Sequence, residues 1–104
     1  MDIPVIHLKT GNADVINSKE VLFIHAAERL TLIHTKDQVY RPAVTLKDFA
    51  EVLLSEGFES LEKSNLTNIN LVQYYDKISN EAYFDKTKEG KSVRVSRRNR
   101  SKMD

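Results

Sequence analysis

The sequence contains no cysteine, and this absence excludes two kinds of stabilising site. Neither a disulfide nor a thiolate zinc site can form without cysteine, which fits the reducing cytoplasm that we expect for this chain. Glycine is also scarce, with three residues in 104. So few glycines leave little material for a phosphate-binding loop, and neither the P-loop, nor G-x-G-x-x-G, nor G-x-S-x-G is present. The common nucleotide-binding and hydrolase motifs are therefore excluded.

Long apolar runs are missing as well. No stretch approaches the roughly 18 apolar residues that a membrane span needs, and the amino terminus does not resemble a secretory signal. His7, His25 and His34 do not follow a metal-ligand spacing, and two of them lie in strand-like runs, where a histidine is usually a packed or surface residue. We therefore predict a protein that is not an enzyme, has no metal or cofactor, and does not enter a membrane.

What the sequence does contain is an uneven distribution of charge. Length and an apolar fraction of 40% suit one globular domain over residues 1–104. The net charge of +1 conceals +5 in residues 88–104, which carry seven basic and two acidic residues, and −4 in residues 1–87. Such an asymmetry directs one end of a molecule toward a polyanion, although a solubilising tail would have the same composition.

Most of the chain has the pattern of short antiparallel strands. Turn residues separate runs that are rich in β-branched and aromatic side chains, and near the end Val93 and Val95 alternate with Arg94 and Ser96. The pattern predicts a mostly β fold with strands near residues 5–9, 14–16, 21–25, 30–35, 38–41, 58–62, 71–75, 82–84 and 92–95.

One segment has a helical period instead. Apolar residues recur at positions 46, 49, 50, 53 and 54, which is the spacing of a single helical face. Gly57 can supply the left-handed residue that ends a helix, and Phe58 can then fold back onto the helix end. We predict one short α-helix at about residues 45–55.

Two basic segments are the candidates for function. Residues 62–65 and 96–100 each follow the end of a strand run, so we expect both on loops or strand ends. Arginine and lysine suit phosphates and guanine edges, while serine and asparagine can donate to phosphates. Lys63 alone has the properties of any surface lysine, but the Arg97–Arg98 pair beside a serine is a stronger indication. Aromatic residues are not interleaved with these cations, so stacking on single strands is not indicated.

The order of these segments resembles the LytTR family of bacterial DNA-binding domains. The family's first strands, short helix, Phe-to-Asn block and terminal Ser-Arg strand correspond here to Ile3–Ile24, Leu46–Leu53, Phe58–Asn68 and Val93–Arg98. The sequence departs from the family pattern at two positions: Glu62 stands where histidine is common, and Asn65 where a bulky apolar residue is usual. We expect Glu62 to repel phosphate and so to alter affinity or site preference.

The resemblance implies a fold, a function and a set of contacts. The fold would be an elongated stack of small antiparallel sheets with one helix, and loops and strand ends would enter the major groove of duplex DNA to regulate transcription. By position, the candidates for base contacts are Arg29, Lys63 and Arg98. The candidates for phosphate contacts are Lys47, Ser64, Ser96, Arg97 and Arg100. The family pattern also implies a monomer that binds direct repeats, and a receiver or sensor domain as partner.

Two other functions fit the residues. The first is a β-rich protein–protein interaction module with a basic C-terminal tail. The second is a single-strand RNA binder. Preference for duplex DNA over single strands or RNA at matched salt separates them from the DNA-binding hypothesis.

Overall fold

The fold follows from short strands that pair with their neighbours along the chain. The computed structural model describes residues 1–45 and 47–103; the side chains of residues 27, 47 and 48 lie outside this description. In the described residues the strands are β1 (Asp2–His7), β2 (Ala13–Asn17), β3 (Phe23–Ala27), β4 (Leu30–His34), β5 (Val39–Pro42), β6 (Phe58–Glu59), β7 (Asn65–Asn68), β8 (Tyr74–Asp76), β9 (Glu81–Tyr83) and β10 (Ser92–Arg94). The helices are α1 (Lys47–Ser55) and the 3₁₀ segments η1 (Ser18–Glu20), η2 (Ile69–Leu71) and η3 (Arg97–Met103).

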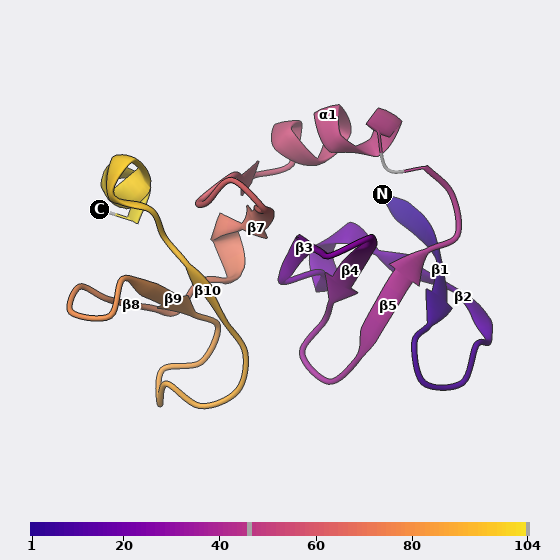
Figure 1. Cartoon of the computed structure of the whole chain (residues 1–104), viewed down its shortest axis with the longest axis horizontal. Coiled ribbons are helices and arrows are strands. Elements are labelled where there is room, and N and C mark those ends of the chain that lie inside the picture. Colours follow the sequence, from indigo (N-terminus) through magenta and orange to yellow (C-terminus); the bar gives the residue numbers. More distant parts are fainter. Residues whose placement is uncertain (46, 104) are drawn as a thin grey trace.

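These strands form two antiparallel sheets. The larger has the order β2-β1-β5-β4-β3-β7-β6, and the smaller has the order β10-β9-β8. The two lie side by side along the long axis, with α1 above the larger sheet and η3 beside the smaller one (Figure 1). The extents of 38 × 27 × 25 Å make the molecule moderately elongated. The prediction of a mostly β, elongated fold with one short α-helix is confirmed.

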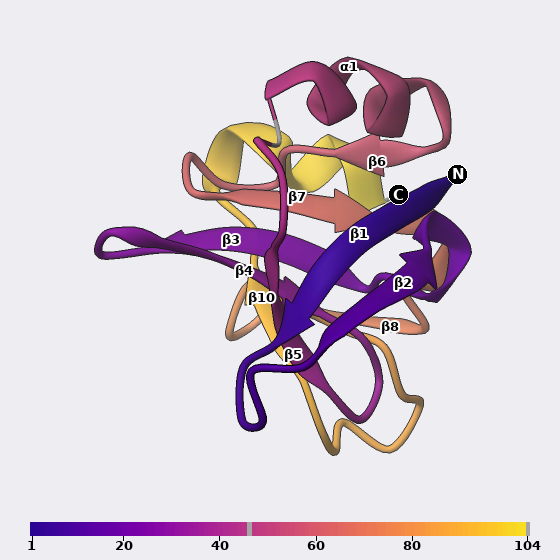
Figure 2. The same cartoon turned by 90° about the vertical axis from the view of Figure 1, so that its right-hand side faces the viewer.

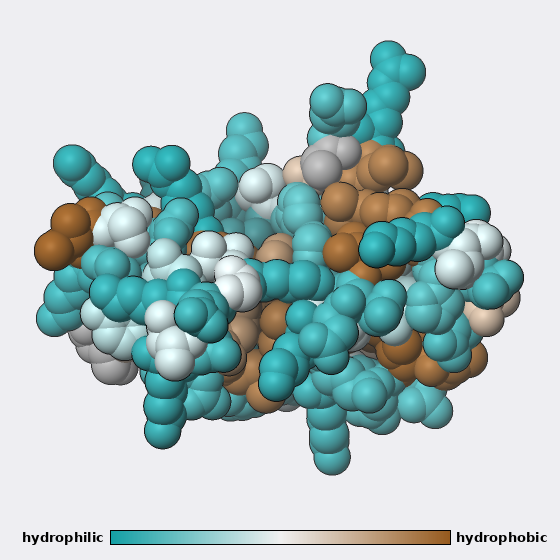
Figure 3. Space-filling view, turned by 90° about the horizontal axis from the view of Figure 1, so that it is seen from below, coloured by the Kyte–Doolittle hydropathy of each residue, from teal (hydrophilic) through white to brown (hydrophobic). Residues whose placement is uncertain are grey.

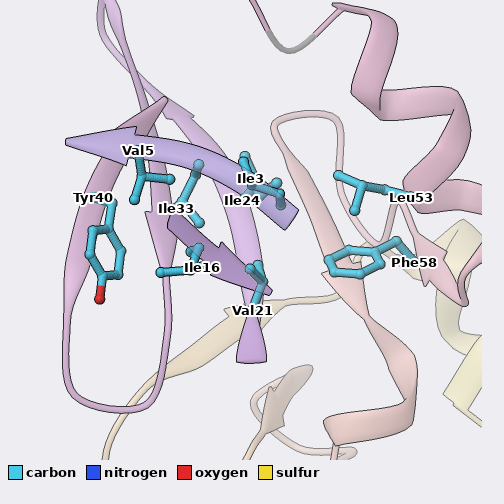
Figure 4. Close-up of a cluster of buried hydrophobic side chains, with 9 residues drawn as sticks. All are labelled: Ile3, Val5, Ile16, Val21, Ile24, Ile33, Tyr40, Leu53 and Phe58. Atoms are coloured by element: carbon cyan, nitrogen blue, oxygen red, sulfur yellow. The ribbon is translucent and has the colours of Figure 1, made fainter. Parts of the chain in front are cut away.

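At its start, strand β3 is buried on both of its faces. Ile24 points into a cluster beneath α1 that also contains Ile33, Leu53 and Phe58 (Figure 4). Phe23 points the opposite way, into a second cluster with Leu61, Ala82, Val93 and Val95. This double burial explains why residues 21–24 form a continuous apolar run rather than an alternating one. The second cluster joins the two sheets.

The helix ends as the sequence predicts. Gly57 has a φ of 98°, which is the left-handed conformation that glycine adopts without strain. Leu53 and Phe58 then meet in the first core cluster. The apolar face is narrower than predicted, however, because Leu54 is 52% exposed. Leu46, which the periodic pattern includes, lies outside the described residues.

All nine predicted strand regions overlap a strand, but two segments differ from expectation. Residues 65–68 form β7, which the sequence did not indicate, and Leu71 belongs to η2 rather than to a strand.

The surface seen from below is mostly hydrophilic, with apolar residues in separate patches (Figure 3). Among the described residues no helix is both long and apolar enough to cross a membrane.

Candidate nucleic-acid interface

The three predicted contact segments lie at one side of the molecule. Strands β3 and β7 pair from Phe23 opposite Thr67 to His25 opposite Asn65, and the pairing continues where the amide of Ala26 donates to the carbonyl of Ser64 at 3.0 Å. The β3–β4 hairpin and the β6–β7 loop therefore project in the same direction, as Figure 2 shows. The chain after β10 joins them, because its amide at residue 96 donates to a carbonyl of the β6–β7 loop, at residue 61, over 2.8 Å.

Arg29 lies at the tip of the β3–β4 hairpin. Residues 27 and 30 are the last paired positions, so Glu28 and Arg29 form the two-residue turn. Glu28 has a φ of 56°, the left-handed conformation that tight hairpin turns require. Both turn side chains are exposed. The two-residue turn holds Arg29 at the end of the hairpin, where it can reach a groove.

Lys63 and Ser64 occupy a tight turn between β6 and β7. The turn is closed by the amide of Asn65, which donates to the carbonyl of Glu62 at 3.1 Å. Both Lys63 and Ser64 are exposed. Since the Ser64 carbonyl is held by β3, the backbone of this turn is anchored while its side chains remain free to contact a ligand.

The second basic segment does not have the expected backbone. Sequence analysis placed Arg97 and Arg98 on a strand end or loop, but β10 ends at Arg94 and residues 97–103 form the 3₁₀ helix η3. Such a helix has three residues per turn, so Arg97 and Arg100 share a face and Arg98 lies about a third of a turn away. All three arginines are exposed. The helical geometry therefore places Arg98 on a different face of η3 from Arg97 and Arg100.

Ser96 and Asn99 secure the start of η3. The Asn99 side chain donates from Nδ2 to Ser96 Oγ at 2.7 Å and to the Leu61 carbonyl at 3.1 Å. Ser96 is partly buried, and its carbonyl also accepts from the Asn99 amide at 3.0 Å. The Ser96 hydroxyl thus has a structural partner, although its own proton is still available for donation to a phosphate.

Asn65, the first residue of β7, also connects these segments through its side chain. Its Oδ1 accepts from the Leu61 amide at 3.0 Å, and its Nδ2 donates to the Arg94 carbonyl at 3.1 Å. Leu61 itself is fully buried in the second core cluster. We call Leu61, Asn65, Ser96 and Asn99 the Leu61 clamp, because their hydrogen bonds join the β6–β7 loop to the segment that follows β10.

The basic residues of the C-terminal segment divide into two groups. Four of the seven contact other parts of the protein. Lys88 pairs with Asp76 at 3.3 Å, Lys102 pairs with Glu59 at 3.3 Å, Arg94 lies 3.8 Å from Glu62, and Lys91 donates to the carbonyls of Thr35 and Gln38 at 2.7 and 2.8 Å. The other three, Arg97, Arg98 and Arg100, have no ion-pair partner within the described residues.

Two further expectations concern single side chains. The Lys47 side chain, a candidate for phosphate contact, lies outside the described residues, although its backbone begins α1. Glu62 is at the interface as expected, and the ion pair with Arg94 offsets part of its charge. The guanidinium of Arg94 is 76% exposed, so this pair is weak and open to competition.

Beside the interface, a cleft of about 400 Å³ separates the Lys63 loop from β10. Its wall includes His25 and His34, which stack on each other at 4.9 Å between ring centroids. Phe23 also stacks on His34, at 4.4 Å between ring centroids, and its ring lies 5.7 Å from that of His25. Burial, followed by the nearby Lys91 charge and the His25 ring, lowers the pKa of His34 to about 4, and burial also lowers the pKa of His25. Both imidazoles are packed residues, as their position in strand runs indicated.

Sequence reasoning missed three residues that organise this side of the molecule. Asn65 and Asn99 belong to the Leu61 clamp, and Lys91 fastens the smaller sheet to the β4–β5 loop. In the sequence, Asn65 differs from the family pattern, but nothing there indicates its hydrogen-bond partners. Asn99 and Lys91 lie within a basic run, and the charge of that run indicated only the binding of a ligand.

Comparison with known proteins agrees with this arrangement. The family model of the LytTr DNA-binding domain matches residues 12–104. A similar solved structure is the LytTr DNA-binding domain of a protein described as a methyl-accepting/DNA response regulator from Bacillus cereus, with 20% identity, a TM-score of 0.72, and coverage of 96% of this chain and 92% of that one. A search of curated proteins found no match. Since the family model spans most of the chain, the protein belongs to the LytTR family, a family of DNA-binding domains rather than of enzymes.

Proposed function

We propose that residues 1–104 act as one domain that binds duplex DNA sequence-specifically and regulates transcription. The observation that carries this proposal is the convergence of the β3–β4 hairpin, the β6–β7 loop and the start of η3 on one side, joined by backbone hydrogen bonds. Each of the three segments presents an exposed cation: Arg29, Lys63 and Arg98. Three separate projections suit reading by loops and turns in the grooves, without a recognition helix.

The roles of the side chains follow from their chemistry. Arg29, Lys63 and Arg98 read bases in the major groove, because a guanidinium or an ammonium can donate to the acceptors of a guanine, although only the guanidinium has the planar fork that matches two acceptors at once. Arg97 and Arg100 contact phosphates from their shared face of η3. Ser64, Ser96 and Lys47 add further phosphate contacts. Phosphate contacts position the protein, whereas the base contacts select the sequence.

A wider arrangement accompanies this function. The free domain is a monomer, two copies bind a direct repeat on one side of the duplex, and a receiver or sensor domain supplies the signal. Sedimentation of the free protein tests the monomer, and the spacing of half-sites in bound DNA tests the repeat.

No ion pair joins Arg97, Arg98 or Arg100 to the described residues, so these three remain available to DNA.

The decisive experiment selects bound sequences from a random duplex pool and then measures affinity across a salt series. We expect one enriched motif, and an affinity that falls by a log–log slope of about 0.9 for every phosphate neutralised. Single-stranded DNA and RNA of the same sequence at matched salt serve as controls. Equal retention of all three nucleic acids, or no enrichment, would refute the proposal, and no retention of any of them would favour a protein–protein interaction module.

Variants of the two neighbouring arginines test the division of roles. Arg98→Ala should lower affinity for the selected site by about 1–3 kcal/mol and affinity for random duplex by much less. Lys63→Ala should act in the same way but more weakly. Arg97→Ala should weaken both duplexes about equally and reduce the salt slope by about one. If Arg98→Ala lowers both affinities by the same factor, Arg98 contacts a phosphate and its assignment to base reading is wrong.

A further inference from the structure

The proposed base contacts come from two different sheets. Arg29 and Lys63 are carried by the larger sheet, through the β3–β4 hairpin and the β6–β7 loop. Arg98 follows β10 of the smaller sheet. Any rotation of one sheet against the other would therefore change the distance between Lys63 and Arg98. Bases in DNA have a fixed spacing, so this distance must be held constant if both side chains are to read one site.

Near the interface, a network of hydrogen bonds joins the two sheets in addition to the apolar contacts of the second core cluster. The amide of Ser96 and the side chain of Asn99 both donate to the Leu61 carbonyl, at 2.8 and 3.1 Å. The Leu61 amide donates to Asn65, whose own Nδ2 reaches the Arg94 carbonyl. Both backbone groups of Leu61 are thus bonded to the clamp, one residue before Glu62 and two before Lys63. On the other side the bonds come from Ser96 and Asn99, which lie two residues before and one residue after Arg98.

The Lys91 contact is separate from this network. Lys91 also joins the smaller sheet to the larger one, through the carbonyls of Thr35 and Gln38. Those carbonyls lie in the β4–β5 loop, at the end of β4 that is opposite to the Arg29 turn. Lys91 can therefore hold the sheets together without determining the local geometry between Lys63 and Arg98. That local geometry depends on the Leu61 clamp.

We propose that Asn65 and Asn99 are specificity-determining positioning residues that set the spacing between Lys63 and Arg98 without touching DNA themselves. This inference rests on the proposed function. Random DNA demands no fixed spacing of base-reading groups, so loss of the clamp leaves phosphate binding intact and removes sequence preference. A residue that contributed only to stability would not separate these two affinities.

The test uses alanine variants of the intact chain and a matched control. Asn65→Ala and Asn99→Ala each remove side-chain amide hydrogen bonds to backbone groups at the interface. Asn68→Ala removes an equivalent bond, from Asn68 Nδ2 to the Val21 carbonyl at 3.2 Å, within the larger sheet and away from the interface. Affinities are measured on the selected duplex and on random duplex over a salt series, and folding is checked by circular dichroism and thermal unfolding.

We expect each clamp variant to bind the selected duplex about three- to tenfold more weakly, which is equivalent to the loss of about one hydrogen bond to a base. Its binding to random duplex and its salt slope should stay those of the wild type. Asn68→Ala should retain the full preference even if its melting temperature falls as far. If Asn65→Ala does not fold, Asn99→Ala carries the test, because it leaves the Asn65 bonds to Leu61 and Arg94 in place.

Two results would overturn the proposal. The first is an unchanged ratio of selected to random affinity in the clamp variants. The second is an equal loss of that ratio in Asn68→Ala, which would assign the effect to general destabilisation. Failure of the underlying function is a distinct outcome, because the wild type itself would then show no preference for any duplex.

Discussion

The stacked histidines make folding stability depend on pH in a predictable direction. Both ring nitrogens of His34 and Nδ1 of His25 are buried and have no hydrogen-bond partner in the described part of the chain. A protonated imidazole in this position would bring an unsolvated charge close to the Lys91 ammonium. Burial accordingly lowers the pKa of His34 from 6.5 to about 4 in the folded protein. The unfolded chain therefore binds a proton at a pH where the folded protein does not.

The sign and size of the effect follow from these two pKa values. His34 contributes its full stability above pH 6.5, and that contribution is lost as the pH falls toward 4. At about 1.36 kcal/mol for each pH unit between the two values, the upper limit is about 3.4 kcal/mol. The ring is only half-buried and solvent screens it, so we expect a loss of about 1 kcal/mol between pH 7 and pH 5.

Urea unfolding followed by circular dichroism at pH 7, 6 and 5 measures this loss. His34→Phe is the matched variant, because a phenyl ring preserves stacking on Phe23 and cannot take up a proton. We expect most of the pH dependence to disappear in this variant and its stability at pH 5 to exceed that of the wild type. A wild-type free energy of unfolding that is constant from pH 7 to pH 5 would refute the reasoning, and so would a variant that keeps the full dependence.

Three other substitutions have clear expected outcomes. Leu61→Ala should lower the free energy of unfolding by about 2–5 kcal/mol in urea titrations, because its side chain is fully buried; a loss below about 1 kcal/mol would contradict the packing described. Gly57→Ala should cost about 1–3 kcal/mol, since its φ of 98° is strained for alanine and the new Cβ would lie 2.5 Å from Asn70 Nδ2; an unchanged melting temperature would be contrary evidence. Glu62→Gln should tighten binding to all duplexes and steepen the salt slope by about 0.9, because Arg94 becomes free for a phosphate, and equal slopes in the two proteins would exclude this role.

The parts of the fold that could be predicted from sequence are those with a periodic apolar pattern. The apolar residues of the helix recur with a spacing that strands do not have, and Gly57, in the left-handed conformation, follows the end of the helix. The strand runs alternate or are continuously apolar according to whether one or both faces are buried. Val93 and Val95, for example, are buried in the second core cluster while Arg94 is exposed, as their alternation predicts.

Strand β7 shows why the remaining parts could not be predicted. Its sequence is Asn-Leu-Thr-Asn, which has the composition of a loop. Thr67 and Asn68 are nevertheless buried, since β7 lies between β3 and β6. In the fold, Thr67 Oγ1 donates to Asn65 Oδ1 and Asn68 Nδ2 donates to the Val21 carbonyl. A pattern of hydrophobicity does not contain these pairings.

For the candidate interface, the sequence indicates candidate residues but not the backbone geometry that carries them. Charge and side-chain type indicate Lys63, Arg97 and Arg98 as candidates for DNA contacts, and the resemblance to the family adds Arg29. Composition could not indicate that Lys91 is held by backbone carbonyls, or that the arginines begin a helical turn. Both facts depend on which segment the basic run packs against, which is decided by contacts distant in sequence.

The register of β7 connects the core to the proposed reading of DNA. Asn65 lies opposite His25, and from that position its side chain bonds both Leu61 and the Arg94 carbonyl. Side chains alternate between the two faces of a strand, so a slip of one residue in β7 would turn Asn65 away from the clamp and expose Thr67 on the other face. The burial of Thr67 opposes such a slip. Core packing thereby fixes the register of β7, and this register allows Asn65 to form the hydrogen bonds of the clamp. The clamp in turn sets the spacing of the side chains that we propose read the bases.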